Sequence, residues 1–313
     1  MKILVTGGAG FIGSHVVDLL IENGHDVAIV DNLRTGNKEN INKKARFYKV
    51  DITNKKLDSV FEKESPEIVY HLAAQANVRI SVDEPLLDAE INVKGTINIL
   101  QNCVKHNIKR IIYTSSGGAI YGEPAKNPAP ETNPIRPLCP YGLTKYIGEE
   151  YVNLYNRLYN LDFRILRYGN VYGPRQDPKG EAGVISIFIG KMMAGEDPLI
   201  FGDGNQTRDY VYVGDVARAN LIALDKDTEN REFNIGFGKE TSVNELFVML
   251  KETMFDYLKK EFFARHVDPV PGEVRQIYLD ISRTKKDLGW SPEIDLKEGM
   301  KRTVDFFMEK ERK

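Results

Sequence analysis

The chain has 313 residues, of which 42% are hydrophobic and 28% are charged, and its formal net charge at pH 7 is −2. This length is sufficient for a full α/β core with a smaller second lobe. The small net charge gives no electrostatic basis for binding nucleic acid or an anionic membrane surface. The apolar run near residues 3–5 is too short for a signal peptide, and no stretch approaches the length of a membrane span.

The two cysteines, Cys103 and Cys139, are isolated from each other. They have neither the spacing of metal ligands nor the pattern of a disulfide framework. We therefore expect no metal site and a reduced, cytoplasmic setting.

The first half of the chain alternates short apolar runs with amphipathic segments. Apolar runs typical of buried parallel strands occur at residues 3–6, 27–30, 47–50, 68–72 and 111–114. Apolar residues at steps of three and four indicate helices near residues 11–23, 55–64 and 85–106. This alternation predicts an α/β fold with a doubly wound parallel sheet of the Rossmann type.

The same pattern continues with a helix over 141–160, a sixth strand at 164–166, a helix near 215–225 and a strand at 232–235. From residue 172 onward, glycine- and proline-containing turns and short mixed elements interrupt it. We therefore predict a first domain of residues 1–170, with a returning segment near 215–236. A smaller α+β domain is expected from residues 171–214 and 237–313.

Glycines at positions 7, 10 and 13 follow the first expected strand and open the first helix. Gly7 permits a tight turn, Gly10 lets the backbone approach a pyrophosphate, and Gly13 allows close packing of helix and strand. Asp31 ends the second strand, 24 residues after Gly7. A carboxylate there binds the adenosine ribose hydroxyls and disfavours a 2′-phosphate, so the pattern predicts NAD, although the nearby Arg34 weighs against it.

Asp51 and Ile52 follow the third strand, where they suit the adenine edge. A loop-capping role for Asp51 is an equal alternative.

Tyr141 and Lys145 lie four residues apart on an expected helix, so their side chains share one face. Lowering the pKa of a tyrosine from ~10 to about 7 takes roughly 4 kcal/mol, which one cation at ~4 Å in a partly shielded site supplies. Ser116 ends the fifth strand, at the edge where ligands of open α/β sheets bind. Beside a nicotinamide, these groups predict proton abstraction from an alcohol with hydride transfer.

Ten segments together resemble the extended short-chain dehydrogenase/reductase family and, within it, the UDP-glucose 4-epimerases. They are residues 6–13, 31–33, 71–75, 92–96, 114–116, 121–124, 141–145, 167–174, 208–211 and 288–290. The resemblance implies NAD-dependent epimerisation of a UDP-sugar at carbon 4, from UDP-glucose to UDP-galactose, through a 4-keto intermediate. It makes residues 1–170 the NAD-binding domain and the smaller domain the site of the nucleotide sugar.

The resemblance also implies residue roles. Tyr141 is the general base or acid, Lys145 lowers its pKa and holds the nicotinamide ribose, and Ser116 hydrogen-bonds the reacting sugar oxygen. Ser115 is the alternative hydroxyl, because the loop at Gly117-Gly118 is one residue longer than the commonest version. The residues expected to contact NAD are Gly7, Gly10, Phe11, Ile12, Gly13, Asp31, Asn32, Asp51, Ile52, Leu72, Ala73, Ala74, Asn92, Thr114, Tyr141, Lys145 and Tyr168.

These motifs identify the family more specifically than they identify the reaction. Related dehydratases and decarboxylases place an acidic residue just before the Tyr-Gly that follows the fifth strand, but residues 117–120 are Gly-Gly-Ala-Ile here. Epimerisation fits best, and a dehydratase, decarboxylase or reductase is the alternative. A third hypothesis is a non-catalytic NAD-binding regulator. The presence of Ser116, Tyr141 and Lys145 argues against it.

Eight residues are expected to bind the UDP-sugar, namely Arg79, Ser116, Asn170, Phe201, Arg208, Tyr210, Glu273 and Arg275. Arg208 resembles the family's diphosphate-binding arginine, and Glu273 its acidic ribose contact. Val270 and Glu84 replace a usual arginine and lysine, so Arg275 is expected to substitute, with a plain surface arginine as the alternative. Ile277 falls where the family gates the sugar's 2-substituent, which predicts UDP-glucose and UDP-galactose as main substrates and weak conversion of UDP-N-acetylglucosamine.

The resemblance further implies a homodimer formed through a four-helix bundle of the helices near 85–106 and 141–160. The second helix carries an apolar stripe of Tyr151, Val152, Leu154, Tyr155, Leu158 and Tyr159. A monomer would leave part of that stripe exposed, which soluble monomers rarely tolerate. The alternative is that the second lobe or the adjoining loop covers it.

Overall fold

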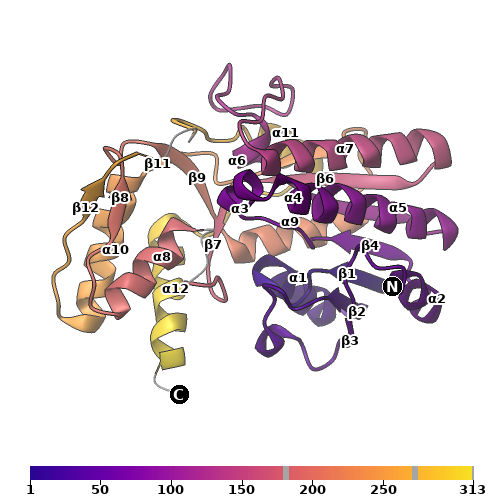
Figure 1. The fold of residues 1–313 in the computed structure, drawn as a ribbon, viewed down its shortest axis with the longest axis horizontal. Coiled ribbons are helices and arrows are strands. Elements are labelled where there is room, and N and C mark those ends of the chain that lie inside the picture. Colours follow the sequence, from indigo (N-terminus) through magenta and orange to yellow (C-terminus); the bar gives the residue numbers. More distant parts are fainter. Residues whose placement is uncertain (179–182, 270–273, 312–313) are drawn as a thin grey trace.

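The computed structural model describes residues 1–178, 183–269 and 274–311. A seven-stranded sheet in the order β10-β6-β5-β4-β1-β2-β3 forms its centre, and every neighbouring pair is parallel (Figure 1). The predicted doubly wound parallel sheet is confirmed. Its strands are β1 (Lys2–Thr6), β2 (Asp26–Asp31), β3 (Arg46–Lys49), β4 (Ile68–His71), β5 (Arg110–Ser116), β6 (Asp162–Tyr168) and β10 (Glu232–Ile235).

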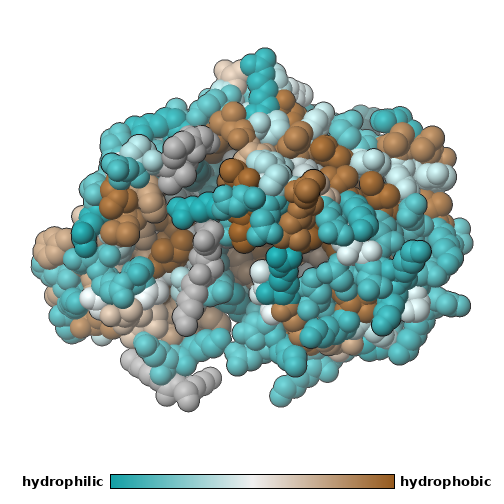
Figure 2. Space-filling model, viewed as in Figure 1, coloured by the Kyte–Doolittle hydropathy of each residue, from teal (hydrophilic) through white to brown (hydrophobic). Residues whose placement is uncertain are grey.

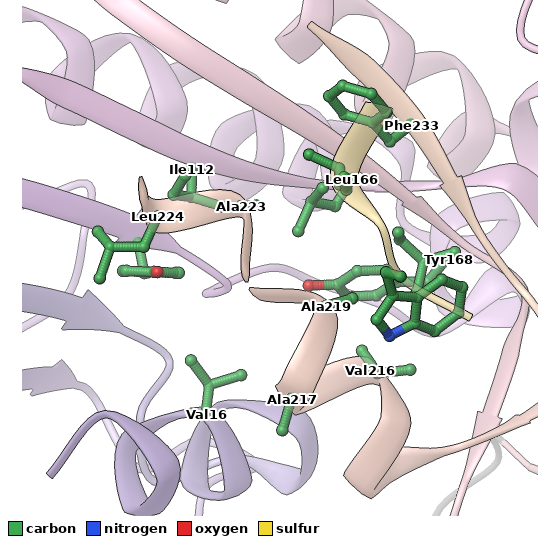
Figure 3. Packing of buried hydrophobic residues seen from close by; sticks show 14 of the residues in the cluster. Val16, Ile112, Leu166, Tyr168, Val216, Ala217, Ala219, Ala223, Leu224 and Phe233 are labelled. Atoms are coloured by element: carbon green, nitrogen blue, oxygen red, sulfur yellow. The ribbon is translucent and has the colours of Figure 1, made fainter. Parts of the chain in front are cut away.

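Helices cover both faces of this sheet, because its central strands are apolar on both sides. On one face, α1 (Phe11–Glu22), α9 (Val213–Asp225) and α11 (Ser282–Leu288) contribute to a core that also contains Trp290 (Figure 3). On the other, α2 (Leu57–Glu64), α5 (Gly95–Lys105) and α7 (Pro140–Tyr159) build a second core. The carboxyl ends of β1, β4 and β5 are left open for a ligand.

The helical stretch expected over 85–106 consists of α4 (Pro85–Ala89), a π-helix η2 (Glu90–Lys94) and α5, preceded by the short α3 (Val78–Asp83). The π-helix surrounds Asn92, whose side chain donates to Gln75 O at 2.9 Å and accepts from Gln75 N at 2.8 Å. Such π-bulges occur frequently at functional sites. Here the bulge turns Asn92 toward the loop that follows β4.

The rest of the chain forms a second lobe beside the sheet (Figure 1). It has a three-stranded sheet in the order β11-β9-β7, a two-stranded sheet of β12 and β8, and its own apolar core. Its elements are β7 (Asn170–Tyr172), α8 (Val184–Met193), β8 (Leu199–Phe201), β9 (Thr207–Tyr212), β11 (Glu240–Ser242), α10 (Val243–Leu258), β12 (Arg265–Val267) and α12 (Leu296–Glu311). Two short helices remain in the first lobe, the 3-10 helix η1 (Lys38–Asn40) and α6 (Gly117–Ile120).

Within the described ranges, no helix is both long and apolar enough to pass through a bilayer. In the same residues, His, Cys, Asp and Glu side chains form no group of three or more that could hold a metal ion.

Candidate functional site

The turn between β1 and α1 is too tight for side chains. A Cβ on Gly13 would lie 2.1 Å from Gly7 O, and one on Gly7, whose φ is +72°, would lie 2.7 Å from Ala73 N. Gly10 is the N-cap residue of α1 and has no side chain with which to cap it. The first-turn N–H groups of α1 therefore remain available, which is the arrangement that binds a pyrophosphate.

A cavity of about 560 Å³ extends from this turn along the carboxyl ends of the strands. Thirteen of the residues expected to contact NAD line it, namely Gly7, Gly10, Phe11, Ile12, Gly13, Asp31, Asn32, Asp51, Ile52, Leu72, Ala73, Ala74 and Thr114. The volume suits an organic cofactor. The chemistry of the lining fits NAD, because it combines the glycine turn with a ribose-binding carboxylate.

Asp31 is well placed for the adenosine ribose. It is 6% exposed, and its two oxygens accept from Ala9 N at 3.1 Å and from Leu33 N at 2.8 Å. Each oxygen keeps a lone pair for a ribose hydroxyl. The carboxylate therefore fixes the glycine turn and lines the cavity at the same time.

Asp51 has the loop-capping role considered for it and also lines the cavity, while its contact with adenine stays a prediction. Its Oδ1 accepts from Thr53 N at 2.8 Å, which is a loop cap, and its Oδ2 accepts from Asn32 Nδ2 at 2.7 Å. Burial raises its pKa, but the hydrogen bonds from Thr53 and Asn32 outweigh burial and hold the pKa below its ordinary value. The residue lines the cavity as an ionised carboxylate.

Four residues expected to contact NAD are not among those that line the cavity, namely Asn92, Tyr141, Lys145 and Tyr168. Tyr141 and Lys145 are described below with Ser116. Tyr168 packs in the core of the α1/α9 face, and its hydroxyl bonds Asn220 (Figure 3). Asn92 is buried and holds the backbone of Gln75, so it shapes the cavity wall from behind. Tyr168 ends β6 and Asn92 lies in η2, and the sequence could not show which way their side chains point.

Parts of the cavity wall come from segments that sequence reasoning missed. The loop 175–178 lines the cavity, and so do Phe306, Phe307 and Lys310 on α12. Lys310 Nζ lies 3.0 Å from Glu39 Oε2, which ties α12 to the loop after β2. The loop 175–178 is held against α1, where Arg175 pairs with Asp18 at 2.7 Å. No local pattern could reveal these contacts, because they join segments far apart in the chain.

Ser116 and Tyr141 meet at the open edge of the sheet. Ser116 is the last residue of β5, Tyr141 lies in the first turn of α7, and their side chains are hydrogen-bonded. Burial raises the pKa of Tyr141 to about 12, and the hydrogen bond from Ser116 opposes this rise. Ser115, the alternative hydroxyl, is 2% exposed, and its Oγ is buried with no hydrogen-bond partner. The geometry therefore favours Ser116 as the hydroxyl that meets a substrate.

Lys145 is 3% exposed, one turn along α7 from Tyr141. Its Nζ lies 4.5 Å from the centroid of the Tyr113 ring. Burial lowers the pKa of Lys145 to about 8, and the charge of Glu149 opposes this effect. The lowering of the Tyr141 pKa by Lys145 stays a prediction for the NAD-bound site.

Three of the expected substrate residues lie against each other or against the site. The guanidinium carbon of Arg79, on α3, lies 5.2 Å from the centroid of the Phe201 ring on β8, so this contact joins the two lobes. Asn170, at the start of β7, is exposed, and its Oδ1 lies 3.2 Å from the position of a Cβ on Gly118. Asn170 therefore stands next to the loop that follows Ser116.

The remaining substrate residues are more dispersed. Arg208 is half-buried on β9, and its Nη1 donates to Thr207 O at 2.8 Å. Tyr210 is 5% exposed and belongs to the core of the second lobe, so its ring packs rather than facing a ligand. Arg275 forms a two-pronged ion pair with Asp203. Glu273 and Val270 lie outside the described residues.

Ile277 does not have the placement expected of a specificity gate. It is 1% exposed and packs in the α1/α9 core. A residue that faces the sugar's 2-substituent must reach the surface of the site, so this interpretation of Ile277 is not supported.

Comparison with known proteins gives consistent matches along the whole chain. Residues 3–236 match the model of the NAD dependent epimerase/dehydratase family. UDP-glucose 4-epimerase of Mycolicibacterium smegmatis is 42% identical over 315 residues, covering 99% of each chain. The crystal structure of Thermotoga maritima UDP-glucose 4-epimerase with UDP-glucose superposes with a TM-score of 0.94 at 51% identity, covering 99% of each chain. The Thermus thermophilus UDP-glucose 4-epimerase complex with NAD gives a TM-score of 0.93 at 41% identity, covering 98% of this chain and 99% of that one.

Proposed function

Since the chain belongs to the NAD-dependent epimerase/dehydratase family, we propose that it interconverts UDP-glucose and UDP-galactose by NAD-dependent epimerisation at carbon 4. The observation that carries this proposal is the hydrogen-bonded Ser116–Tyr141 pair at the carboxyl end of β5, the strand whose Thr114 lines the cavity that fits NAD. Residues 117–120 carry no carboxylate, which supports reversible hydride and proton transfer rather than elimination. The protein is therefore an isomerase that passes through a 4-keto sugar.

NAD, when bound, supplies a hydride acceptor and a positively charged nicotinamide ring. Tyr141 takes the proton of the sugar's 4-hydroxyl, Ser116 hydrogen-bonds the same oxygen, and Lys145 holds the nicotinamide ribose. Moving the pKa of Tyr141 from about 12 to about 7 corresponds to roughly 7 kcal/mol of differential stabilisation of the phenolate. Nearby positive charge in the closed site is what can supply an effect of this size. After the 4-keto sugar turns, its opposite face would receive the hydride back at carbon 4 while Tyr141 returns the proton to the 4-oxygen, so the opposite configuration results.

The second lobe is the proposed site of the nucleotide sugar, and residues 1–170 with the segment near 215–236 are proposed to bind NAD. The lobe takes most of residues 171–214 and 237–313, but the stretch 277–290, with α11 and Trp290, packs on the main sheet instead. Arg79 and Phe201 close over the substrate from the two lobes, as their 5.2 Å contact supports. Arg208 and Asn170 contact the diphosphate, and Arg275 exchanges its pairing with Asp203 for the nucleotide. Fixed cations of this kind are what a diphosphate requires.

The test is incubation of the purified protein with UDP-glucose, without added reductant, and detection of UDP-galactose. We expect Tyr141→Phe to abolish turnover with folding and NAD binding intact, because only the ionisable oxygen is lost. Ser116→Ala should cost on the order of 10²-fold, the size of one proton-relay contribution. Absence of UDP-galactose from the wild-type reaction would overturn the proposal, and a Tyr141→Phe rate within a few-fold of wild type would remove Tyr141 from the mechanism.

We also propose a homodimer. Figure 2 shows apolar side chains gathered over α3, α4 and α7. The exposed apolar residues of these helices are Val78, Val82, Leu86, Leu143, Leu158 and Tyr159. Of the stripe expected on α7, Val152 is buried in the protomer and Tyr151 and Tyr155 pack against its core. Leu158 and Tyr159 stay exposed, so the proposed surface for a partner combines this end of α7 with α3 and α4. Light scattering should give a mass near twice 35.5 kDa, and a mass near 35.5 kDa would contradict the dimer.

The two cysteines support a reducing, cytoplasmic location. Cys103 is buried and Cys139 is partly buried, and both are free thiols. Unpaired cysteines are typical of compartments in which thiols stay reduced.

A further inference from the structure

A buried carboxylate lies next to the proposed catalytic pair without belonging to it. Asp88, on α4, is 0% exposed, and its side chain accepts three hydrogen bonds. Thr144 Oγ1 donates to its Oδ2 at 2.6 Å, and Gln75 Nε2 and Asn92 Nδ2 donate to its Oδ1 at 2.8 and 3.1 Å. A buried charge is costly unless it is hydrogen-bonded, and this carboxylate is satisfied from three sides.

Each of the three donors comes from a segment that shapes the site. Thr144 lies on α7 between Tyr141 and Lys145. Gln75 belongs to the segment 72–77 that lines the cofactor cavity, and Asn92 holds the backbone of Gln75 from the π-helix. Asp88 therefore links the helix of the catalytic pair to the wall of the cofactor cavity.

The same network continues toward the sugar side of the site. Gln75 Oε1 accepts from Asn77 N at 2.6 Å, and Asn77 Oδ1 caps α3 by accepting from Ile80 N at 3.0 Å. α3 carries Arg79, which stacks on Phe201 of the second lobe. Loss of the Asp88 contacts would loosen three parts of the site together.

We propose that Asp88 is a positioning residue that fixes Tyr141 and Lys145 relative to the segment 72–77, and that its negative charge sets the pH range in which this pair works. The proposal rests on the epimerase function given above. Asp88 acts through Thr144, Gln75 and Asn92 and touches neither substrate nor cofactor.

The charge of Asp88 acts on both members of the pair. Burial is the largest influence on Lys145, lowering its pKa, and Glu149 and then Asp88 oppose it. Burial also has the largest influence on Tyr141, raising its pKa; Ser116 opposes the rise, and Cys139 and Asp88 add to it.

The titratable groups that face this pair come from several elements. They are Glu149 on α7, Cys139 before α7, Asp88 on α4, Tyr113 on β5 and His71 on β4. Removal of the Asp88 charge alone leaves the others in place and lowers the pKa of both Tyr141 and Lys145.

The consequence is a displacement of the whole pH profile. Turnover requires Tyr141 to give up its proton and Lys145 to keep one, so these groups define the acid and alkaline limbs. Without the Asp88 charge both limbs should move to lower pH. A purely structural defect would reduce the rate and leave both limbs in place.

The experiment compares Asp88→Asn with Glu90→Gln, a matched control in which an exposed carboxylate paired with Lys94 loses the same charge. The pH profile of kcat/KM is measured for UDP-glucose, and the release rate of NADH is measured by its fluorescence. We expect Asp88→Asn to lose ~10–100-fold in kcat/KM, to shift both limbs to lower pH and to release NADH several-fold faster. Glu90→Gln should match the wild type in all three measurements.

A second variant covers the case in which Asp88→Asn does not fold. Thr144→Val removes the 2.6 Å hydrogen bond but not the charge, so it should lower kcat/KM with unmoved limbs. Wild-type limbs and NADH release in Asp88→Asn, or wild-type kcat/KM in Thr144→Val, would overturn the proposal. If the wild type turns over no UDP-hexose, the proposed function fails. The NADH release rates of the variants still decide whether Asp88 positions the segment 72–77, which lines the cofactor cavity.

Discussion

The buried ion pair between Glu149 and Arg167 gives a prediction whose size follows from its geometry. Glu149, 1% exposed on α7, accepts from Arg167 Nε at 3.0 Å and from Nη2 at 2.6 Å. Arg167 Nη1 also donates to Tyr121 Oη and to Glu131 O, each at 3.0 Å. In Glu149→Gln the guanidinium would stay buried with only neutral partners.

Removal of one partner from a buried pair costs about 3–5 kcal/mol, because the other charge is left uncompensated. Glutamine keeps one acceptor for the guanidinium, so we expect a loss of about 3 kcal/mol in the free energy of unfolding. Urea unfolding followed by the fluorescence of Trp290, the only tryptophan and 0% exposed, measures it directly. Glu150→Gln, on the exposed side of the same helix, is the control and should change stability little.

The double variant Glu149→Met/Arg167→Met removes both charges. It therefore separates the contribution of the ion pair from the cost of leaving one buried charge unpaired. Because apolar replacement of a buried ion pair is often neutral, we expect it to be at least about 1 kcal/mol more stable than Glu149→Gln. Tyr121 Oη keeps its hydrogen bond to Asn234 Oδ1 at 2.8 Å in this variant. A Glu149→Gln stability within about 0.5 kcal/mol of wild type, or a double variant no better than the single one, would refute the reasoning.

Two further predictions concern the cofactor turn and acid stability. Gly13→Ala would place a Cβ 2.1 Å from Gly7 O, so it should weaken NAD binding at least ~100-fold, measured by fluorescence titration with NADH. Gly24→Ala has open space around its Cβ but a φ of +79°, so it should lose stability; because Gly24 does not line the cavity, the folded variant should bind NADH as wild type does. His71 is 2% exposed, and burial lowers its pKa to about 3, so the native state keeps it neutral while the unfolded chain protonates it below pH ~6.5. Stability from His71 is therefore present above that pH and lost as pH falls, by about 2 kcal/mol at pH 5. The difference in free energy of unfolding between wild type and His71→Gln, measured in urea at pH 7 and at pH 5, should be smaller at pH 5 by that amount. An equal difference at both pH values would contradict the lowered pKa of His71.

The sequence was most informative where a function depends on local chain geometry. The glycine spacing and Asp31 could be interpreted because strand, turn and helix follow one another within one βαβ unit, and all of these residues line the cavity. Tyr168 was placed against the cofactor, and its side chain lies in the core instead. A strand presents alternate residues to opposite faces, and the face cannot be known before the helices are placed.

The electrostatics of the site depend on burial, which residue spacing does not reveal. The step of four residues from Tyr141 to Lys145 predicted a coupled pair, whereas burial raises the pKa of Tyr141. The network around Asp88 was also hidden in the sequence. Its members come from α4, η2, α7 and the loop after β4, and nothing in their order along the chain indicates that they meet.

The cavity wall supplied by α12 has a consequence for protein synthesis. Gly7 and Lys310 line the same cavity, 303 positions apart in the chain. A ribosome adds about 5–20 residues per second, so roughly 15–60 s separate the first of these residues from the last. The early strands and α1 can fold during that interval, but the cavity acquires its last wall only when α12 has left the ribosome. Chains that terminate prematurely before residue 306 would therefore carry an intact glycine turn and an open cofactor site.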